Sequence, residues 1–103
     1  MIRTSVFGKT ADGREVIAFR LTDGKNEATI LNYGGIIQSL KIADKEGELR
    51  DVVLGYDDVA GYENNGGYLG ALIGRVGNRI EKGKLVIDGQ EYSLYCNDRG
   101  NHL

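Results

Sequence analysis

The 103-residue sequence predicts an all-β fold of short antiparallel strands, for three reasons. The pairs Asp12–Gly13, Asp23–Gly24 and Asp88–Gly89 each lie between segments of β-branched and aromatic residues, which is the pattern of tight hairpins. No window keeps apolar residues at helical spacing for three turns. The sequence has sixteen glycines and no proline, and glycine readily takes the backbone conformations of tight turns. We therefore expect an antiparallel sandwich or meander.

The first half of the chain is expected to hold four strands. Arg14–Leu21 alternates between two sets of side chains, as a strand with two distinct faces does. Three segments of similar character follow, at Glu27–Tyr33, Gly35–Ala43 and Leu49–Tyr56. A charged turn at Asp44–Glu48 separates the last two.

The second half predicts three more strands, at Tyr68–Gly74, Lys84–Gly89 and Glu91–Cys96. A single short helical turn is expected before them, within the sequence "DDVAGYE". In that turn Asp57 would cap the N-terminus and Gly61 would end the helix.

The composition excludes several classes of function. Thirteen Lys and Arg against fifteen Asp and Glu give a net charge of −2, which offers no field for nucleic acid or an anionic membrane. No apolar run reaches the roughly 20 residues that span a bilayer, and no signal-peptide core is seen, so we expect a cytoplasmic protein. Cys96 and His102 are the only residues of their kinds, so we expect no disulfide within the chain, and a closed zinc site would lack ligands.

The stretch Gly74–Ile80, "GRVGNRI", places polar side chains in an otherwise apolar run. One interpretation is structural: Arg75 and Arg79 are surface charges at a strand end, and Asn78 is a turn residue. The other is functional: a bend at Gly77 turns Asn78 and Arg79 toward one pocket. Guanidinium donors and an amide donor and acceptor would suit the hydroxyls of a sugar. Spacing alone leaves both interpretations open.

Two further features have the same ambiguity. Tyr56, Tyr62 and Tyr68 lie in the preceding loop, where they could present a flat apolar surface to a sugar ring or simply pack the loop. His102 is expected to be exposed, and it could act as an acid or base only within reach of a substrate proton.

A nucleic-acid interpretation of the same glycines is weaker. "IGRVGNRI" fits the glycine spacing of a KH-type clamp, which needs a helix on each side of the loop. Only "EKG" separates Ile80 from the next strand, so the second helix has no sequence to form from. A phosphate loop is also disfavoured, because Gly70 and Gly74 are not followed by the required Gly-Lys-Ser/Thr.

Taken in order, "NYGGIIQSL", "DVVLGYDDVAGY", "YLGALIGRVGNRI" and "GKLVIDGQEYSL", followed by "NDRGNHL", resemble the N-terminal third of the aldose 1-epimerase family. The similarity runs from about Ile17 to Leu103. It implies an antiparallel β-sandwich of the galactose mutarotase type, called a supersandwich. Residues 1–103 would then form the N-terminal portion of a single β-sandwich domain.

The resemblance also implies an activity, the interconversion of the α and β anomers of aldohexoses such as galactose or glucose. In the family a glutamate removes the proton of the C1 hydroxyl while a histidine protonates the ring oxygen. The ring opens, the C1–C2 bond rotates and the ring closes on the other face, without cofactor or metal. Such acid and base groups must face one sugar at the same time.

Carried over by position, Asn78 and Arg79 match the Asn-Arg pair that binds sugar hydroxyls in the family. Arg75 matches a frequent arginine with no substrate contact assigned. The family's first active-site histidine lies in a Leu-His-Gly-Gly motif, and the sequence ends on that leucine, Leu103. His102 matches a variable position two before the histidine, so the resemblance implies no catalytic residue in this chain.

We therefore expect a truncated member of the family, inactive by itself. The expected partners are an aldohexose and, because a part-sandwich leaves sheet edges and an apolar face uncovered, either a second copy or the rest of the domain. The alternative is a non-catalytic β-domain that binds carbohydrate or self-assembles.

Overall fold

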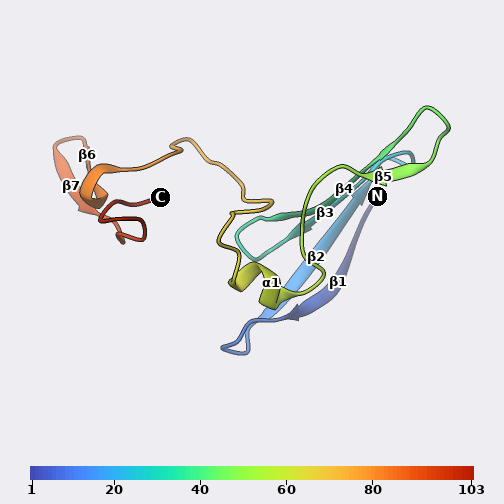
Figure 1. The fold of residues 1–103 in the computed structure, drawn as a ribbon, viewed down its shortest axis with the longest axis horizontal. Helices are drawn as coiled ribbons and strands as arrows, with labels where there is room; N and C mark the ends of the chain where they lie inside the picture. Colours follow the sequence, from blue (N-terminus) through green and yellow to red (C-terminus); the bar gives the residue numbers. More distant parts are fainter. The chain divides into compact units, whose positions relative to one another are not determined.

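The computed structural model describes all residues, 1–103, and divides into two compact units (Figure 1). The first unit is Met1–Leu72 and the second is Ile73–Leu103.

The first unit is built on a five-stranded antiparallel sheet whose strands pair in chain order (Figure 1). The strands are β1 Ile2–Lys9, β2 Glu15–Thr22, β3 Glu27–Leu31, β4 Ile37–Ala43 and β5 Leu49–Asp51. A meander of this kind arises when short turns join strands that are neighbours in the sequence. The all-β, antiparallel class predicted from the sequence is confirmed.

The second unit holds the remaining two strands, β6 Lys84–Ile87 and β7 Gln90–Ser93, which pair with each other. Asp88 and Gly89 join them with positive φ angles of 51° and 79°, as in the type I′ turn that an Asp-Gly pair predicts. A 3₁₀ turn, Glu81–Gly83, precedes β6.

A short helix, α1 Val59–Glu63, lies where one helical turn is expected, but its details correct the prediction. The N-cap is Asp58 rather than Asp57, because the Asp58 carboxylate accepts the N–H of Gly61 at 2.8 Å. Gly61 does not end the helix; it lies inside it. The helix ends after Glu63, at the C-cap Asn64.

Two other differences concern strands. The segment Tyr68–Gly74 forms no strand, although its apolar run resembles one. The first strand, β1, was not predicted as an element, although the Asp12–Gly13 hairpin requires a strand before it. Most other strands begin within two residues of their predicted starts and end earlier, notably β5, which stops at Asp51.

The core of the first unit lies between α1 and one face of the sheet. Its buried apolar side chains come from β2, β3, the turn after β3 and α1: Val16, Ala18, Leu31, Ile36, Val59 and Tyr62. Phe7 is the extra residue of a bulge between Val6 and Gly8, and its ring packs against Tyr62 with centroids 6.3 Å apart.

The glycine at position 8 allows α1 to approach β1. A Cβ at Gly8 would lie 2.9 Å from the Cγ2 atom of Val59 on the helix. The close contact therefore depends on the absence of a side chain on β1 at this point.

The opposite face of the sheet is apolar on every strand from β1 to β4. Residues directly opposite each other share a face, and the register pairs Val6 with Ile17, Phe19 with Ile30, and Ala28 with Leu40. We call this the apolar face; it comprises Ile2, Val6, Ile17, Phe19, Leu21, Ala28, Ile30, Ile37, Leu40 and Ile42. Several members are open to solvent, with Ile2 67% and Val6 59% exposed.

Charged side chains lie on the core side, beyond the part of the sheet that α1 covers. Glu27 on β3 is buried, and its carboxylate pairs with Arg20 on β2. The ammonium of Lys41, on β4, lies 3.7 Å from the same carboxylate. The two cations compensate a carboxylate that would otherwise be costly to bury.

No helix in the structure is both long enough and apolar enough to cross a membrane.

Candidate functional site

The segment around Asn78 lies in the second unit and is extended or bent rather than a regular strand. Asn78 itself has a φ of 61°, in the left-handed region. Asparagine is among the few residues other than glycine that adopt this conformation readily. The expected bend is therefore present, but Asn78 takes the left-handed conformation and Gly77 does not.

The guanidinium of Arg79 is held by two acceptors. Its Nε–H donates to the Asp98 carboxylate in an ion pair, and its Nη1 donates to Oδ1 of Asn78 at 3.3 Å. Arginine carries five N–H donors, so two are used and three have no partner in the chain. The side chain is 50% exposed, which leaves these donors accessible to a ligand.

Asp98 lies at the first position of a tight two-residue turn. Its backbone N–H and C=O both pair with Asn101, at 2.9 and 2.8 Å. Arg99 and Gly100 between them have φ angles of 49° and 82°. Positive φ at both central positions is typical of a type I′ turn.

The Asp98 turn is joined to the Arg79 segment by backbone pairing. Ile80 and His102 form an antiparallel bridge with N···O distances of 2.7 and 3.1 Å. Next to this bridge, the N–H of Lys82, two residues after Ile80, donates to Oδ1 of Asn101, one residue before His102, at 3.0 Å. Arg79 and Asp98 therefore meet because their segments are paired next to them.

The free polar groups of this site are mainly donors. Nδ2 of Asn78 has no partner in the chain, whereas its Oδ1 already accepts from Arg79. Together with the three free N–H groups of Arg79, this gives a donor-rich surface. Such a surface suits the oxygen lone pairs of sugar hydroxyls, whereas the amide acceptor that the functional interpretation of Gly74–Ile80 also expects is occupied by Arg79.

His102 lies beside this segment through its backbone. Its Nδ1 is 2.6 Å from the carbonyl oxygen of Tyr95, which can only accept, so Nδ1 carries the proton and donates. In the neutral ring Nε2 is then the acceptor. His102 is partly buried, so the expectation of an exposed side chain is wrong.

The remaining candidates have structural roles or no contact. Tyr62 is 4% exposed and Tyr56 packs against the same core, so packing explains both rings. Tyr68 is 52% exposed.

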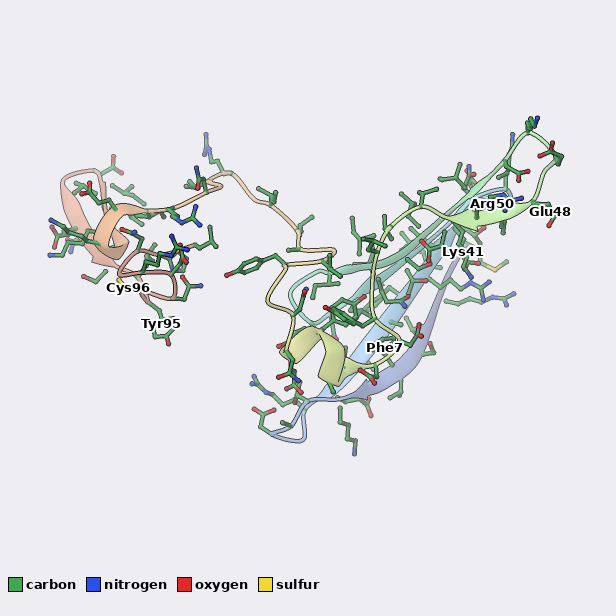
Figure 2. All side chains as sticks on the ribbon, in the orientation of Figure 1. Phe7, Lys41, Glu48, Arg50, Tyr95 and Cys96 are labelled. Carbon is green, nitrogen blue, oxygen red and sulfur yellow. The ribbon has the colours of Figure 1, made fainter.

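Arg75 is exposed and makes no ion pair. Cys96 is exposed and follows Tyr95 after β7 (Figure 2), so it is not a strand residue.

The KH-type clamp is excluded by the backbone. That motif needs helices on both sides of Gly74–Gly77, and residues 73–103 contain only the 3₁₀ turn Glu81–Gly83.

Asp98 is the residue of this site that sequence reasoning did not find. The sequence "DRGN" contains a usable signal, because a glycine at the second central position of a short turn favours a hairpin. Such a hairpin returns the chain toward the segment that precedes β6. The signal shows a turn but not which side chain the carboxylate meets.

Known proteins are similar to this chain over a range that includes these site residues. A family model described as aldose 1-epimerase matches residues 18–103. Galactose mutarotases from Bos taurus and Homo sapiens are each 38% identical over 103 residues, which cover 99% of this chain and 30% of their own. A probable aldose 1-epimerase from Arthroderma benhamiae is 37% identical over 75 residues, 69% of this chain and 17% of its own.

Solved structures of an aldose epimerase homologue and of a galactose 1-epimerase also match the chain. A GalM/aldose epimerase homologue from C. elegans matches with a TM-score of 0.66 and 32% identity, over 82% of this chain and 26% of its own. A galactose 1-epimerase from Lactobacillus acidophilus NCFM matches over 100% of this chain and 30% of its own, with a TM-score of 0.63 and 22% identity. These matches confirm the predicted fold type. The chain spans about 30% of the length of the mutarotases that it matches.

Proposed function

The chain belongs to the aldose 1-epimerase family, and we propose that it supplies the sugar-binding segment of an enzyme that interconverts the anomers of an aldohexose such as galactose or glucose. The observation that carries the proposal is the pair Asn78 and Arg79. These adjacent residues present free N–H donors, lie within the residues that the family model matches, and have the type of polar group that a neutral polyol needs.

In the proposed reaction a base takes the proton of the C1 hydroxyl and an acid protonates the ring oxygen. The bond between C1 and the ring oxygen breaks, which leaves an open-chain aldehyde. Rotation about C1–C2 and closure of the ring give the other anomer. These steps move protons and break and re-form one C–O bond without any net oxidation or reduction, so the proposed reaction uses no redox cofactor. Its rate depends on two proton-transfer groups held against one sugar.

We propose that Asn78 and Arg79 fix the sugar ring in this reaction by donating to its hydroxyl oxygens. We assign the acid and the base to no residue of these 103, and we propose the activity for the whole protein. His102 is not assigned as the acid, because its protonated Nδ1 is already bonded to the Tyr95 carbonyl.

Polarimetry of freshly dissolved α-galactose tests the proposal. The full product of the gene should accelerate mutarotation, and the 103-residue chain should not. Arg79→Ala in the full product should reduce turnover strongly without unfolding the protein, whereas Arg75→Ala is the matched control and should leave the rate unchanged. Wild-type turnover in Arg79→Ala would refute the role of Arg79.

We also propose that a second β-layer of the same family domain covers the apolar face. The support is the side-chain pattern: four neighbouring strands each place apolar residues on this face, as the inner face of a sandwich does. Matched structures of this family are more than three times as long as the chain and include material that could form that layer. In the 103-residue chain alone, a second copy of the chain would cover the apolar face instead.

A cytoplasmic location belongs to the same proposal. Fractionation of cells that express the protein at natural levels tests it.

A further inference from the structure

We propose that Asp98 is a positioning residue for Arg79: it holds the guanidinium so that its free N–H groups face the sugar in one fixed orientation. The inference rests on the proposed sugar-binding role of Arg79. It assigns to Asp98 no contact with substrate.

The carboxylate of Asp98 meets the guanidinium of Arg79 at one particular nitrogen. Asp98 accepts from Nε of Arg79, the nitrogen nearest the aliphatic stem. A carboxylate at Nε fixes the rotation of the guanidinium plane while both Nη2 hydrogens and one Nη1 hydrogen stay free. Asn78 engages Nη1 from the neighbouring position. The guanidinium group is therefore held through Nε and Nη1, while its Nη2 hydrogens remain free to bind a ligand.

Asp98 is itself restrained, which a positioning residue must be. Its backbone is closed against Asn101 by hydrogen bonds of 2.9 and 2.8 Å. Asn101 in turn accepts the Lys82 N–H at 3.0 Å. The Asp98 side chain is 22% exposed, less than half the exposure of Arg79, so the carboxylate is the more enclosed partner.

The Arg79–Asp98 ion pair should contribute little to the free energy of unfolding. Ion pairs with one half-exposed member add little to folding free energy, because water and salt screen them. Orientation is different: a long arginine that must be immobilised on binding loses side-chain entropy, and a group already held in place loses less. The loss of Asp98 should therefore reduce sugar affinity much more than it reduces stability.

The test uses the full product of the gene and titrates galactose by NMR, following the side-chain Nε–Hε signal of Arg79. Asp98→Asn should weaken galactose binding about tenfold, the effect of losing one charge-assisted hydrogen bond. It should also move the Arg79 signal toward that of a free arginine. Asp98→Glu, which keeps the carboxylate, should recover most of the affinity.

Asp88→Asn is the matched control. Asp88 occupies the other tight turn of the same unit, has a φ of 51° and makes no side-chain ion pair. Its replacement by asparagine removes the same charge from a comparable turn and should change neither the affinity nor the Arg79 signal.

A second comparison separates positioning from direct contact. In an Arg79→Ala background, Asp98→Asn should cause no further loss of affinity. A further loss of similar size would show that Asp98 acts on the sugar without Arg79, and would overturn the inference. Wild-type affinity in Asp98→Asn would overturn it as well. Failure of the unmodified protein to bind galactose, or unchanged binding in Arg79→Ala, would instead refute the proposed function on which the inference depends.

Discussion

The hydroxyl of Tyr62 accepts the backbone N–H of Tyr56 at 3.1 Å, while the two rings meet edge to face with centroids 5.2 Å apart. The loop that leads into α1 is thus fixed to the helix at two points. Gly61 lies directly against the Tyr56 ring, because a Cβ at this position would be 2.5 Å from it. Two of the three tyrosines that resemble ligand groups in the sequence, Tyr56 and Tyr62, therefore belong to the core or pack against it.

Gly61→Ala should destabilise the first unit by about 1–2 kcal/mol. The clash with the Tyr56 ring outweighs the roughly 1 kcal/mol by which alanine favours a helix. Urea denaturation measures the difference. Gly66→Ala is the control, since a Cβ there meets nothing within 4 Å; an equal loss in both variants would show that the ring contact is not the cause.

Leu31→Ala should cost about 2–5 kcal/mol, because Leu31 is only 1% exposed and its removal leaves a cavity in the core. Leu54→Ala removes the same atoms from a side chain that is 77% exposed and should cost well under about 1 kcal/mol. Thermal unfolding of both variants gives the comparison. Similar midpoints would contradict the placement of the core.

The turn between β2 and β3 should loosen in acid. The Asp23 carboxylate accepts the N–H groups of Asn26 and Lys25 at 2.6 and 2.8 Å, and these bonds lower its pKa from 3.8 to about 2. A lowered pKa in the folded state means that the stabilisation is complete above pH 3.8 and is lost as the pH falls toward 2. Amide shifts of Lys25 and Asn26 should follow this titration.

The Asp23→Asn variant supplies the control for this pH dependence. Asparagine can keep hydrogen bonds in the turn but carries no charge to titrate. Its Lys25 and Asn26 amide shifts should therefore be flat between pH 4 and pH 2. A step in this variant would assign the change to another group.

The backbone and the side chain of Asn78 can be separated by two substitutions. Its φ of 61° suits glycine, so Asn78→Gly should fold normally but bind galactose several-fold more weakly, because the amide donors are lost. Asn78→Ala should add a loss of about 1 kcal/mol in stability from the left-handed backbone. Unchanged galactose affinity in both variants would remove Asn78 from the proposed site.

The 103-residue chain should self-associate through the apolar face. Phe19→Ser places a polar group at the middle of that face and should shift sedimentation toward the monomer. Tyr95→Ser, at a residue 82% exposed in the other unit, should have no effect. A stable, well-folded monomer of the unmodified chain would contradict the proposal.

The sheet was predictable from the sequence because its signals are local. Asp-Gly pairs mark the hairpins, and alternation marks the strands that follow them. The segment Tyr68–Gly74 was mistaken for a strand because its composition is that of one. In the structure Gly70 has a φ of 70°, and a Cβ there would lie 2.3 Å from the Ile37 carbonyl oxygen, so the chain turns where a strand would continue.

The candidate site was only partly predictable. The pattern "GNR" and the family resemblance indicate Asn78 and Arg79, and their role stays a prediction. Asp98 lies nineteen residues from Arg79, and only the pairing of Ile80 with His102 brings the two together. Long-range pairing between single residues leaves no periodicity in a sequence, which is why Asp98 could not be found there. The prediction that residues 1–103 belong to a single domain also remains to be tested.

The Asp51 carboxylate caps strand β4 at the point where its neighbour β5 ends. Its Oδ1 accepts the N–H of Leu40 at 3.1 Å and that of Val53 at 3.2 Å, so a carboxylate takes the place of a neighbouring strand where β5 ends. β1, at the opposite margin, pairs on one side only. β5, the other edge strand, also pairs on one side only, but it has three residues where β1 has eight, and past its end the Asp51 carboxylate holds the Leu40 N–H. An incoming strand would therefore find the longer row of open backbone groups on β1, which makes that margin the preferred place for the sheet to be extended.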